Sequence, residues 1–143
     1  MFLVIINGPN LNLLGKREPQ IYGSETFEAT LDSIRQAFPG QTIEYFQSNY
    51  EGELIDKIQQ TGFDKECIGI VINPGAYAHY STAIADAIAA IPVPTVEVHI
   101  SNIHAREEFR KENVTGRACK AVIAGCGRKG YSYALSFLLD SHR

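Results

Sequence analysis

The residues with the clearest chemical potential lie at positions 7–23, in a segment rich in Gly, Pro and Asn that follows the apolar run at positions 2–6. Within it, Arg17 and Tyr22 stand five residues apart. A tyrosine hydroxyl is neutral at pH 7, but a neighbouring guanidinium favours the phenolate, a base able to remove a proton beside a ketone. The Gly and Pro residues argue against a regular helix and favour a functional loop, a lid at about 15–24. The alternative is a solvated loop in which both side chains face water.

A second pair of reactive side chains occurs in the sequence Glu97-Val98-His99. In an extended segment, Glu97 and His99 face the same side. The carboxylate can then fix the tautomer of the imidazole and stabilise its protonated form, as a general acid or base requires. A structural ion pair at the end of a strand is the alternative interpretation.

An anion site is predicted directly after His99. Free backbone N–H groups near a helix start, together with the Ser101 hydroxyl, can hold a carboxylate. We expect a short helix at 105–109, in which Arg106 and Arg110 share a face and point toward that ligand. A solvated surface helix of mixed charge is the alternative.

Three histidines and one aspartate have less specific surroundings. His79 lies in a loop that enters a helix, where it either binds a hydroxyl or caps the loop. Asp86, further along that helix, is expected from its position alone to form a surface salt bridge. His104 and His142 are expected to be exposed to solvent.

The elements that must position these residues alternate between strands and helices. Strands are expected at 2–6, 42–47, 68–72, 95–98 and 118–124. Helices are expected at 25–38 with Ser24 as cap, from Asn49 to about Gly62, from Ser81 to about Ala90, and at 131–139.

This alternation predicts an α/β fold, a flavodoxin-like doubly wound sandwich with a five-stranded parallel sheet in the order 2-1-3-4-5. In such sheets the ligand binds beyond the carboxyl ends of the strands. Polar residues gather at those ends, with Asn7 and Asn10 after the first strand, Asn73 after the third, and Glu97 and His99 at the fourth. The predicted site therefore lies at one edge of the sheet.

Length and composition restrict the class of protein. We expect residues 1–143 to form one soluble, cytoplasmic catalytic domain. A net charge of −3 gives no support for a nucleic-acid partner, no apolar run reaches the ~18 residues of a membrane span, and the N-terminus lacks the features of a secretion signal. The cysteines, Cys67, Cys119 and Cys126, lack metal-ligand spacing and are expected to be reduced thiols.

A glycine motif at Gly125–Gly130 matches the dinucleotide pattern G-x-G-x-x-G, but the match is weak. It follows the last strand, and too little chain remains for the acidic residue that binds the ribose. A tight turn that makes room for a ligand or for a subunit contact is the favoured interpretation.

Taken together, these residues resemble those of type II 3-dehydroquinate dehydratases over nearly the whole chain. The matching blocks are Ile6–Gly15, Arg17–Pro19, Tyr22-Gly23, Gln47–Asn49, Glu51-Gly52, Asn73–Tyr77, His79, Ser81, Glu97–His104, Arg106-Glu107, Arg110, and Gly125, Gly127 and Gly130-Tyr131. Two departures from the family pattern are Ala78 and Tyr80, where small hydroxylated residues are more usual, and the segment 111–117.

The resemblance implies anti elimination of water from 3-dehydroquinate through an enolate, giving 3-dehydroshikimate without a cofactor, a metal or a Schiff base. The reaction would serve aromatic amino-acid biosynthesis through the shikimate pathway or, alternatively, quinate breakdown. By this resemblance Tyr22 would be the base that removes the C2 proton, activated by Arg17. Asn10 would stabilise the enolate. His99 would protonate the departing C1 hydroxyl, oriented by Glu97.

The resemblance also implies a set of substrate-binding residues. These would be Asn73, His79, Asp86, Ile100, Ser101, Arg106 and Arg110. Ile100 and Ser101 would hold the substrate carboxylate, and Arg106 would support the lid tyrosine. Asn73, His79 and Arg110 would bind the ring hydroxyls. Asp86 would reach the site of an adjacent subunit, because proteins similar to this one form a dodecamer assembled from trimers.

Two other functions are compatible with this fold. A flavin-binding electron carrier requires a Ser/Thr-rich phosphate loop after the first strand, whereas Gly8–Gly15 contains neither residue. A phosphoacceptor signalling domain requires an acidic cluster at the first and third strand ends, where this chain has Asn7, Asn10 and Asn73. The site, rather than the fold, separates these functions.

Overall fold

Five strands pair in parallel to form the central sheet of the computed structural model, which describes residues 1–143. The strands are β1 (Phe2–Asn7), β2 (Ile43–Gln47), β3 (Cys67–Asn73), β4 (Thr95–His99) and β5 (Ala121–Ala124). Their spatial order, β2-β1-β3-β4-β5, confirms the predicted order 2-1-3-4-5. Every residue of β3 is buried, because helices cover both faces of the sheet.

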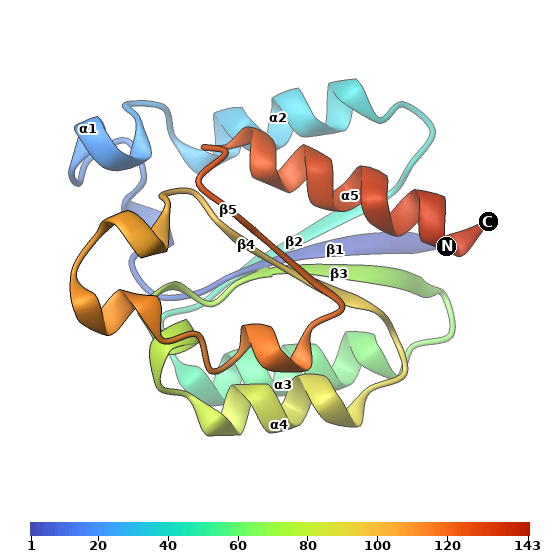
Figure 1. Cartoon of the computed structure of the whole chain (residues 1–143). Helices are drawn as coiled ribbons and strands as arrows, with labels where there is room; N and C mark the ends of the chain where they lie inside the picture. The colour runs from blue at the N-terminus through green and yellow to red at the C-terminus, as the bar shows by residue number, and fades with distance from the viewer.

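The helices form the outer two layers (Figure 1). Helices α2 (Phe27–Ala37) and α5 (Lys129–His142) cover one face of the sheet, and α3 (Glu51–Gly62) and α4 (Thr82–Ala90) cover the other. This arrangement is the predicted doubly wound sandwich. None of the helices combines the length and the apolar composition that a membrane crossing requires.

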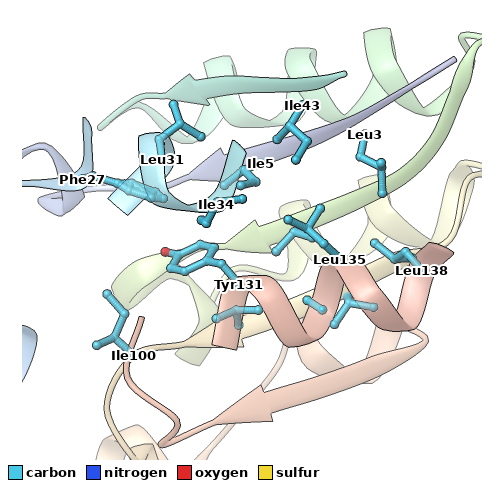
Figure 2. Close-up of a cluster of buried hydrophobic side chains, with 14 of the residues drawn as sticks. Leu3, Ile5, Phe27, Leu31, Ile34, Ile43, Ile100, Tyr131, Leu135 and Leu138 are labelled. Carbon is cyan, nitrogen blue, oxygen red and sulfur yellow. The ribbon is translucent and has the colours of Figure 1, made fainter. Parts of the chain in front are cut away.

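The two faces of the sheet contribute to two separate hydrophobic cores. Along β1, Leu3 and Ile5 belong to the core beneath α2 and α5, whereas Val4 and Ile6 belong to the core beneath α3 and α4. Figure 2 shows the first core, where side chains from the sheet meet those of α2 and α5. Each fully buried Leu or Ile side chain stabilises the fold by about 1.5–3 kcal/mol. Because successive side chains of a strand point to opposite faces of the sheet, the same strand contributes to the cores on both sides.

Of the three predicted helix caps, one is confirmed. Ser81 caps α4, since its hydroxyl accepts from Ile84 N at 3.0 Å. The predicted Ser24 cap is wrong, because Thr26 caps α2 and accepts from Ala29 N at 3.3 Å. Asn49 does not cap α3. Its side-chain oxygen accepts instead from the backbone N–H of Asn10 at 3.0 Å, tying two loops of the site edge together.

The segment after β4 differs from its prediction. The single helix expected at 105–109 is absent, and two 3-10 turns, Ile103–Ala105 and Glu108–Lys111, occupy this stretch. The Asn102 side chain accepts from His104 N at 3.1 Å and starts the first turn early, and Arg106 between the turns has an extended backbone. Arg106 and Arg110 therefore do not share a helix face.

Two further boundaries were also predicted wrongly. Strand β5 begins at Ala121, because Gly116–Ala118 forms a 3-10 turn first. The segment 15–24, predicted to be a lid, contains one α-helical turn, α1 (Pro19–Tyr22), although its Gly and Pro content argued against a helix. Proline is tolerated at the first helical position, and Gly23, at φ 85°, ends the turn directly after Tyr22.

Candidate active site

The carboxyl ends of the strands meet at one edge of the sheet and surround a cleft. Register pairs Asn7 at the end of β1 with Asn73 at the end of β3, and His99 at the end of β4 with Ala124. The cleft contains about 560 Å³ of empty space, part of which is open solvent. All but two of the predicted site residues line it. They are Asn10, Arg17, Tyr22, Asn73, His79, His99, Ile100, Ser101, Arg106 and Arg110.

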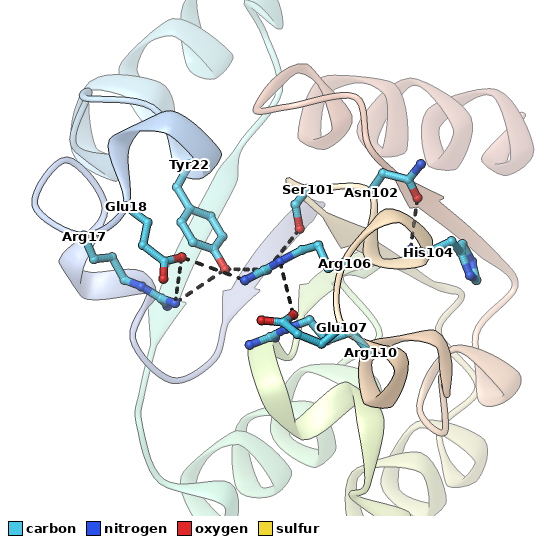
Figure 3. A network of polar contacts seen from close by, with 9 residues as sticks. All are labelled: Arg17, Glu18, Tyr22, Ser101, Asn102, His104, Arg106, Glu107 and Arg110. Atoms are coloured by element: carbon cyan, nitrogen blue, oxygen red, sulfur yellow. Dashed lines mark hydrogen bonds and ion pairs between the residues drawn. The ribbon is translucent and has the colours of Figure 1, made fainter.

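The predicted lid segment places the Tyr22 hydroxyl between two guanidinium groups (Figure 3). The phenolic oxygen accepts from Arg106 Nη1 at 2.8 Å and from Arg17 Nη2 at 3.5 Å. The Arg17 guanidinium also lies 4.6 Å from the centre of the tyrosine ring. Two positive charges that donate to one oxygen stabilise negative charge on it. The geometry is therefore suited to a tyrosine that acts as a base.

Glu18 was not among the predicted residues, yet it lies beside both arginines. Its carboxylate Oε2 is 3.8 Å from Arg17 Nη2 and 3.8 Å from Arg106 Nη2. Its backbone is left-handed, at φ 37°, an uncommon conformation for a residue other than glycine. Glu18 thus balances part of the positive charge around Tyr22 at the point where α1 begins.

A buried carboxylate holds the imidazole of His99, which lines the same cleft. Glu97 is fully buried, and its Oε2 accepts from His99 Nε2 at 2.8 Å. The other carboxylate oxygen accepts from the hydroxyl of Thr115, which is also fully buried. Because Glu97 engages Nε2, Nδ1 is the nitrogen of His99 that is free to carry the transferable proton. Thr115 is a second residue that sequence reasoning missed.

A buried tyrosine fixes the amide of Asn73. The Tyr131 hydroxyl accepts from Asn73 Nδ2 at 2.9 Å and donates to Asn7 Oδ1 at 2.8 Å. Burial raises the pKa of Tyr131, so this hydroxyl stays protonated. The Asn73 oxygen accepts from Gly75 N at 3.1 Å. With the amide oriented in this way, Asn73 retains one N–H for a ligand.

His79 presents an acceptor to the cleft. Its Nδ1 lies 2.7 Å from the carbonyl oxygen of Glu112, and since a carbonyl can only accept, Nδ1 carries the proton. Desolvation lowers the pKa of His79, which keeps the ring neutral. Nε2 is then an unprotonated acceptor, suited to a ligand hydroxyl.

The glycine turn after β5 supports the predicted carboxylate site. Gly125 N donates to His99 O at 3.2 Å, and Gly127 N donates to Ile100 O at 3.0 Å. A side chain at Gly125 would approach Asn102 Cβ to 3.1 Å, in a backbone conformation with φ 88°. The motif therefore holds the backbone beside Ser101 in place, which agrees with a tight turn rather than a dinucleotide loop.

The remaining predicted residues occupy different positions. Arg110 lines the cleft, and its Nε donates to Glu107 Oε2 at 2.7 Å. The backbone N–H of Glu107, followed by Arg110, lowers the pKa of that carboxyl. Asn10 lines the cleft with a left-handed backbone at φ 69°. Asp86 is exposed on α4 and does not line the cleft of its own chain.

The arrangement can carry out two proton transfers within one cleft. A tyrosine flanked by arginines can remove a proton, and a histidine backed by a carboxylate can deliver one. Ser101, Asn73 and His79 supply polar groups between them. Removal of a C–H proton together with loss of a hydroxyl as water requires such a pair. The site is therefore suited to the elimination of water from a small polar molecule.

Comparison with known proteins gives consistent matches along the chain. The model of the family "Dehydroquinase class II" matches residues 1–139. A 3-dehydroquinate dehydratase of Caldicellulosiruptor bescii is 56% identical over 143 residues, covering 96% of this chain and 98% of that protein. The type II dehydroquinase of Butyrivibrio crossotus is 48% identical, with a TM-score of 0.92 and 97% of each chain covered. The type II dehydroquinase of Propionibacterium acnes is 43% identical, with a TM-score of 0.91 and coverage of 96% and 95%.

Proposed function

The chain belongs to the class II dehydroquinase family, and we propose that it converts 3-dehydroquinate into 3-dehydroshikimate by anti elimination of water through an enolate. Its relatives at 56% and 52% identity carry the name 3-dehydroquinate dehydratase, and this supports the dehydration. The observation that carries the mechanism is that Tyr22 and His99 line the same cleft. The Tyr22 hydroxyl is flanked by two guanidinium groups, and His99 is hydrogen-bonded to a buried carboxylate.

Tyr22 is the base in this proposal. Its phenolate removes the proton from C2 of the substrate, and the C–H electrons form the enolate. Arg106, 2.8 Å from the phenolic oxygen, and Arg17, at 3.5 Å, stabilise the phenolate before the transfer. Asn10, which lines the same cleft, stabilises the enolate that forms.

His99 is the acid. The enolate electrons return to form the new double bond while the C1–O bond breaks, and the proton of His99 goes to the departing oxygen to form water. Glu97, 2.8 Å from Nε2, stabilises the imidazolium before that step. The proton gained by Tyr22 then passes to solvent and His99 regains one, so that the cycle balances.

The other cleft residues hold the substrate. Ser101 and the backbone of Ile100 bind the carboxylate, and the Gly125–Gly127 turn keeps that backbone in place. The free N–H of Asn73 and the Nε2 acceptor of His79 bind ring hydroxyls. Arg110, which also lines the cleft, binds ring hydroxyls together with them.

Assembly and pathway extend the same proposal. Asp86 is exposed on α4 and lies outside the cleft of its own chain, which is compatible with a role in the site of an adjacent subunit in a dodecamer built from trimers. A place in the shikimate pathway of aromatic amino-acid biosynthesis, in the cytoplasm, rests on the family resemblance alone. Quinate breakdown by the same reaction is the alternative.

Turnover of 3-dehydroquinate is the direct test of this proposal. We expect the purified protein to generate the ultraviolet absorbance of a conjugated enone when it is mixed with the substrate. Borohydride traps an imine but does not react with a tyrosine base. Enzyme treated with borohydride in the presence of substrate and then desalted should therefore retain its activity. Absence of the enone with folded protein would refute the proposed function, and inactivation by borohydride would refute the mechanism without a Schiff base.

Substitution of Thr115 tests whether its hydrogen bond to Glu97 assists His99 as the acid. Replacing Thr115 with valine keeps the shape of the side chain and removes the hydroxyl that donates to Glu97. A buried carboxylate oxygen then loses its partner, which should lower the free energy of unfolding by about 1–3 kcal/mol. We expect kcat to fall about tenfold and KM to change less than twofold, since Thr115 does not line the cleft.

Thr115→Ser is the matched control for that variant. Serine retains the hydroxyl, and its kcat should stay within twofold of wild type in the same steady-state assay. A valine variant with wild-type kcat would show that the hydroxyl does not support the acid. Equal losses in both variants would show that the methyl group, rather than the hydroxyl, matters.

A further inference from the structure

Arg128 reaches from the glycine turn after β5 to the end of the lid. Its Nε and Nη2 both donate to the carbonyl oxygen of Tyr22, at 3.1 and 2.8 Å. Its Nη1 donates to Thr26 O at 3.0 Å and to Thr30 Oγ1 at 2.8 Å. The side chain is only 15% exposed. One guanidinium thus fixes both the residue that ends α1 and the first turn of α2, whose start lies beside the N-terminal end of α5 in Figure 1.

The acceptor of two of these bonds belongs to the proposed catalytic base. The four-residue helix α1 ends at Tyr22, and the last carbonyls of a helix have no partner within it. A helix of one turn is not stable in isolation, so the position of Tyr22 depends on contacts from outside α1. Arg17 and Arg106 hold the hydroxyl end of this residue. Arg128 holds its main-chain end.

The neighbouring glycine is adapted to this contact. Gly23, with φ 85°, lies directly against Arg128, since a Cβ built on it would be 3.4 Å from both Nε and Nη2. At the other end of the lid, Gly15 has φ 93°. Backbone in this region is open to glycine at no steric cost, and such residues absorb the changes in φ and ψ when a loop moves. Arg128 therefore contacts one of the two positive-φ glycines at the ends of the predicted lid.

Arg128 does not stabilise helix α5 from its position at the start of that helix. Arg128 occupies the N-cap position of that helix, and it makes no side-chain capping bond there. A positive charge at a helix N-terminus opposes the helix dipole and is disfavoured there. The interactions that offset this cost are the four hydrogen bonds to the lid and α2, together with an ion pair in which Arg128 Nη1 lies 3.8 Å from Glu25 Oε2.

We propose that Arg128 is a positioning residue for the dehydration: it fixes the hinge of the lid at Gly23 and thereby the placement of Tyr22 relative to the substrate. The inference rests on the proposed function, because it assigns Tyr22 as the base. A displacement of about 1 Å in a reacting group can lower a rate about 100-fold. Loss of this anchor should therefore slow proton removal without a comparable loss of substrate affinity.

Arg128→Met tests this directly, and Arg35→Met is a matched control. Arg35 makes the same two-pronged contact, donating from Nε and Nη2 to Ile43 O at 3.1 and 2.7 Å, and it does not line the cleft. In Arg128→Met we expect kcat to fall by 10- to 100-fold and KM to change less than threefold. With substrate deuterated at C2, the isotope effect on kcat should be at least as large as in wild type. In Arg35→Met, kcat, KM and the isotope effect on kcat should all keep their wild-type values.

A second measurement follows the lid without reference to activity. Trypsin can cleave the lid after Lys16 and after Arg17, and cleavage at these positions, followed by mass spectrometry, reports how often the lid opens. We expect at least fivefold faster cleavage in Arg128→Met and no change in Arg35→Met. If Arg128→Met does not fold, Arg128→Lys keeps the charge but not the two-pronged geometry, and the same changes should appear with smaller size.

The outcomes separate this inference from the proposed function. A wild-type enzyme without dehydratase activity would refute the function, and lid cleavage would still decide whether Arg128 holds the hinge. With an active wild type, three results would overturn the inference. These are a kcat within twofold of wild type in Arg128→Met, an equal fall in Arg35→Met, and a smaller isotope effect in Arg128→Met.

Discussion

Replacement of Tyr22 with phenylalanine should lower kcat by about 100- to 10,000-fold, the contribution expected of a general base. The change removes one oxygen, which accepts from Arg106 at 2.8 Å and from Arg17 at 3.5 Å. The ring remains, together with its contact to the Arg17 guanidinium at 4.6 Å from the ring centre. Steady-state kinetics should show the fall in kcat, and calorimetric titration should show that the product still binds.

Tyr80→Phe is the control for this variant. Tyr80 is 64% exposed, stacks edge-on against Tyr77, and does not line the cleft although it adjoins His79. Its kcat should stay within twofold of wild type. A Tyr22→Phe enzyme that retains more than a tenth of wild-type kcat would exclude Tyr22 as the base. The proton would then have to be removed by another group of the cleft.

The fold follows from local patterns to a large extent. Apolar β-branched runs placed all five strands, and the buried run of β3 indicated a sheet covered on both faces. Two of the errors lie where a side chain has a choice of hydrogen-bond partner. Asn49 was predicted to cap a helix but binds Asn10 N in a distant loop, and Asn102 starts a 3-10 turn that replaces the predicted helix at 105–109. Such choices depend on tertiary contacts that propensity does not contain.

In the candidate site, too, contacts between residues close in sequence were predicted, whereas contacts between distant residues were not. Glu97 and His99 could be paired from the sequence because two residues on a strand face the same side, and the structure places them 2.8 Å apart. Thr115 contacts Glu97 across a sequence separation of 18, and Arg128 contacts Tyr22 across a separation of 106. The periodicity of a helix or strand in the sequence cannot predict contacts between residues so far apart. Tyr131 had one signal, its place in a block shared with the family.

Substitution of His99 is the second change with a large expected effect. His99→Gln retains a side-chain N–H at the reach of Nε2, so that Glu97 keeps a donor, but glutamine cannot supply a proton to a leaving group. We expect kcat to fall by about 100- to 10,000-fold in the enone assay, with little change in thermal stability. The loss should fall on the elimination step. Exchange of the C2 proton with deuterated water, followed by NMR, should therefore continue in this variant.

His99→Ala separates the chemical role from the structural one. Alanine leaves the fully buried Glu97 with Thr115 as its remaining partner, and a buried acceptor that loses its hydrogen-bond donor costs about 1–3 kcal/mol of stability. The two variants should therefore share the loss of kcat but differ in melting temperature, because only alanine removes the donor to Glu97. Turnover near the wild-type rate in His99→Gln would refute the acid assignment. Loss of C2 exchange in that variant would indicate instead that His99 acts on the first step, beside Tyr22.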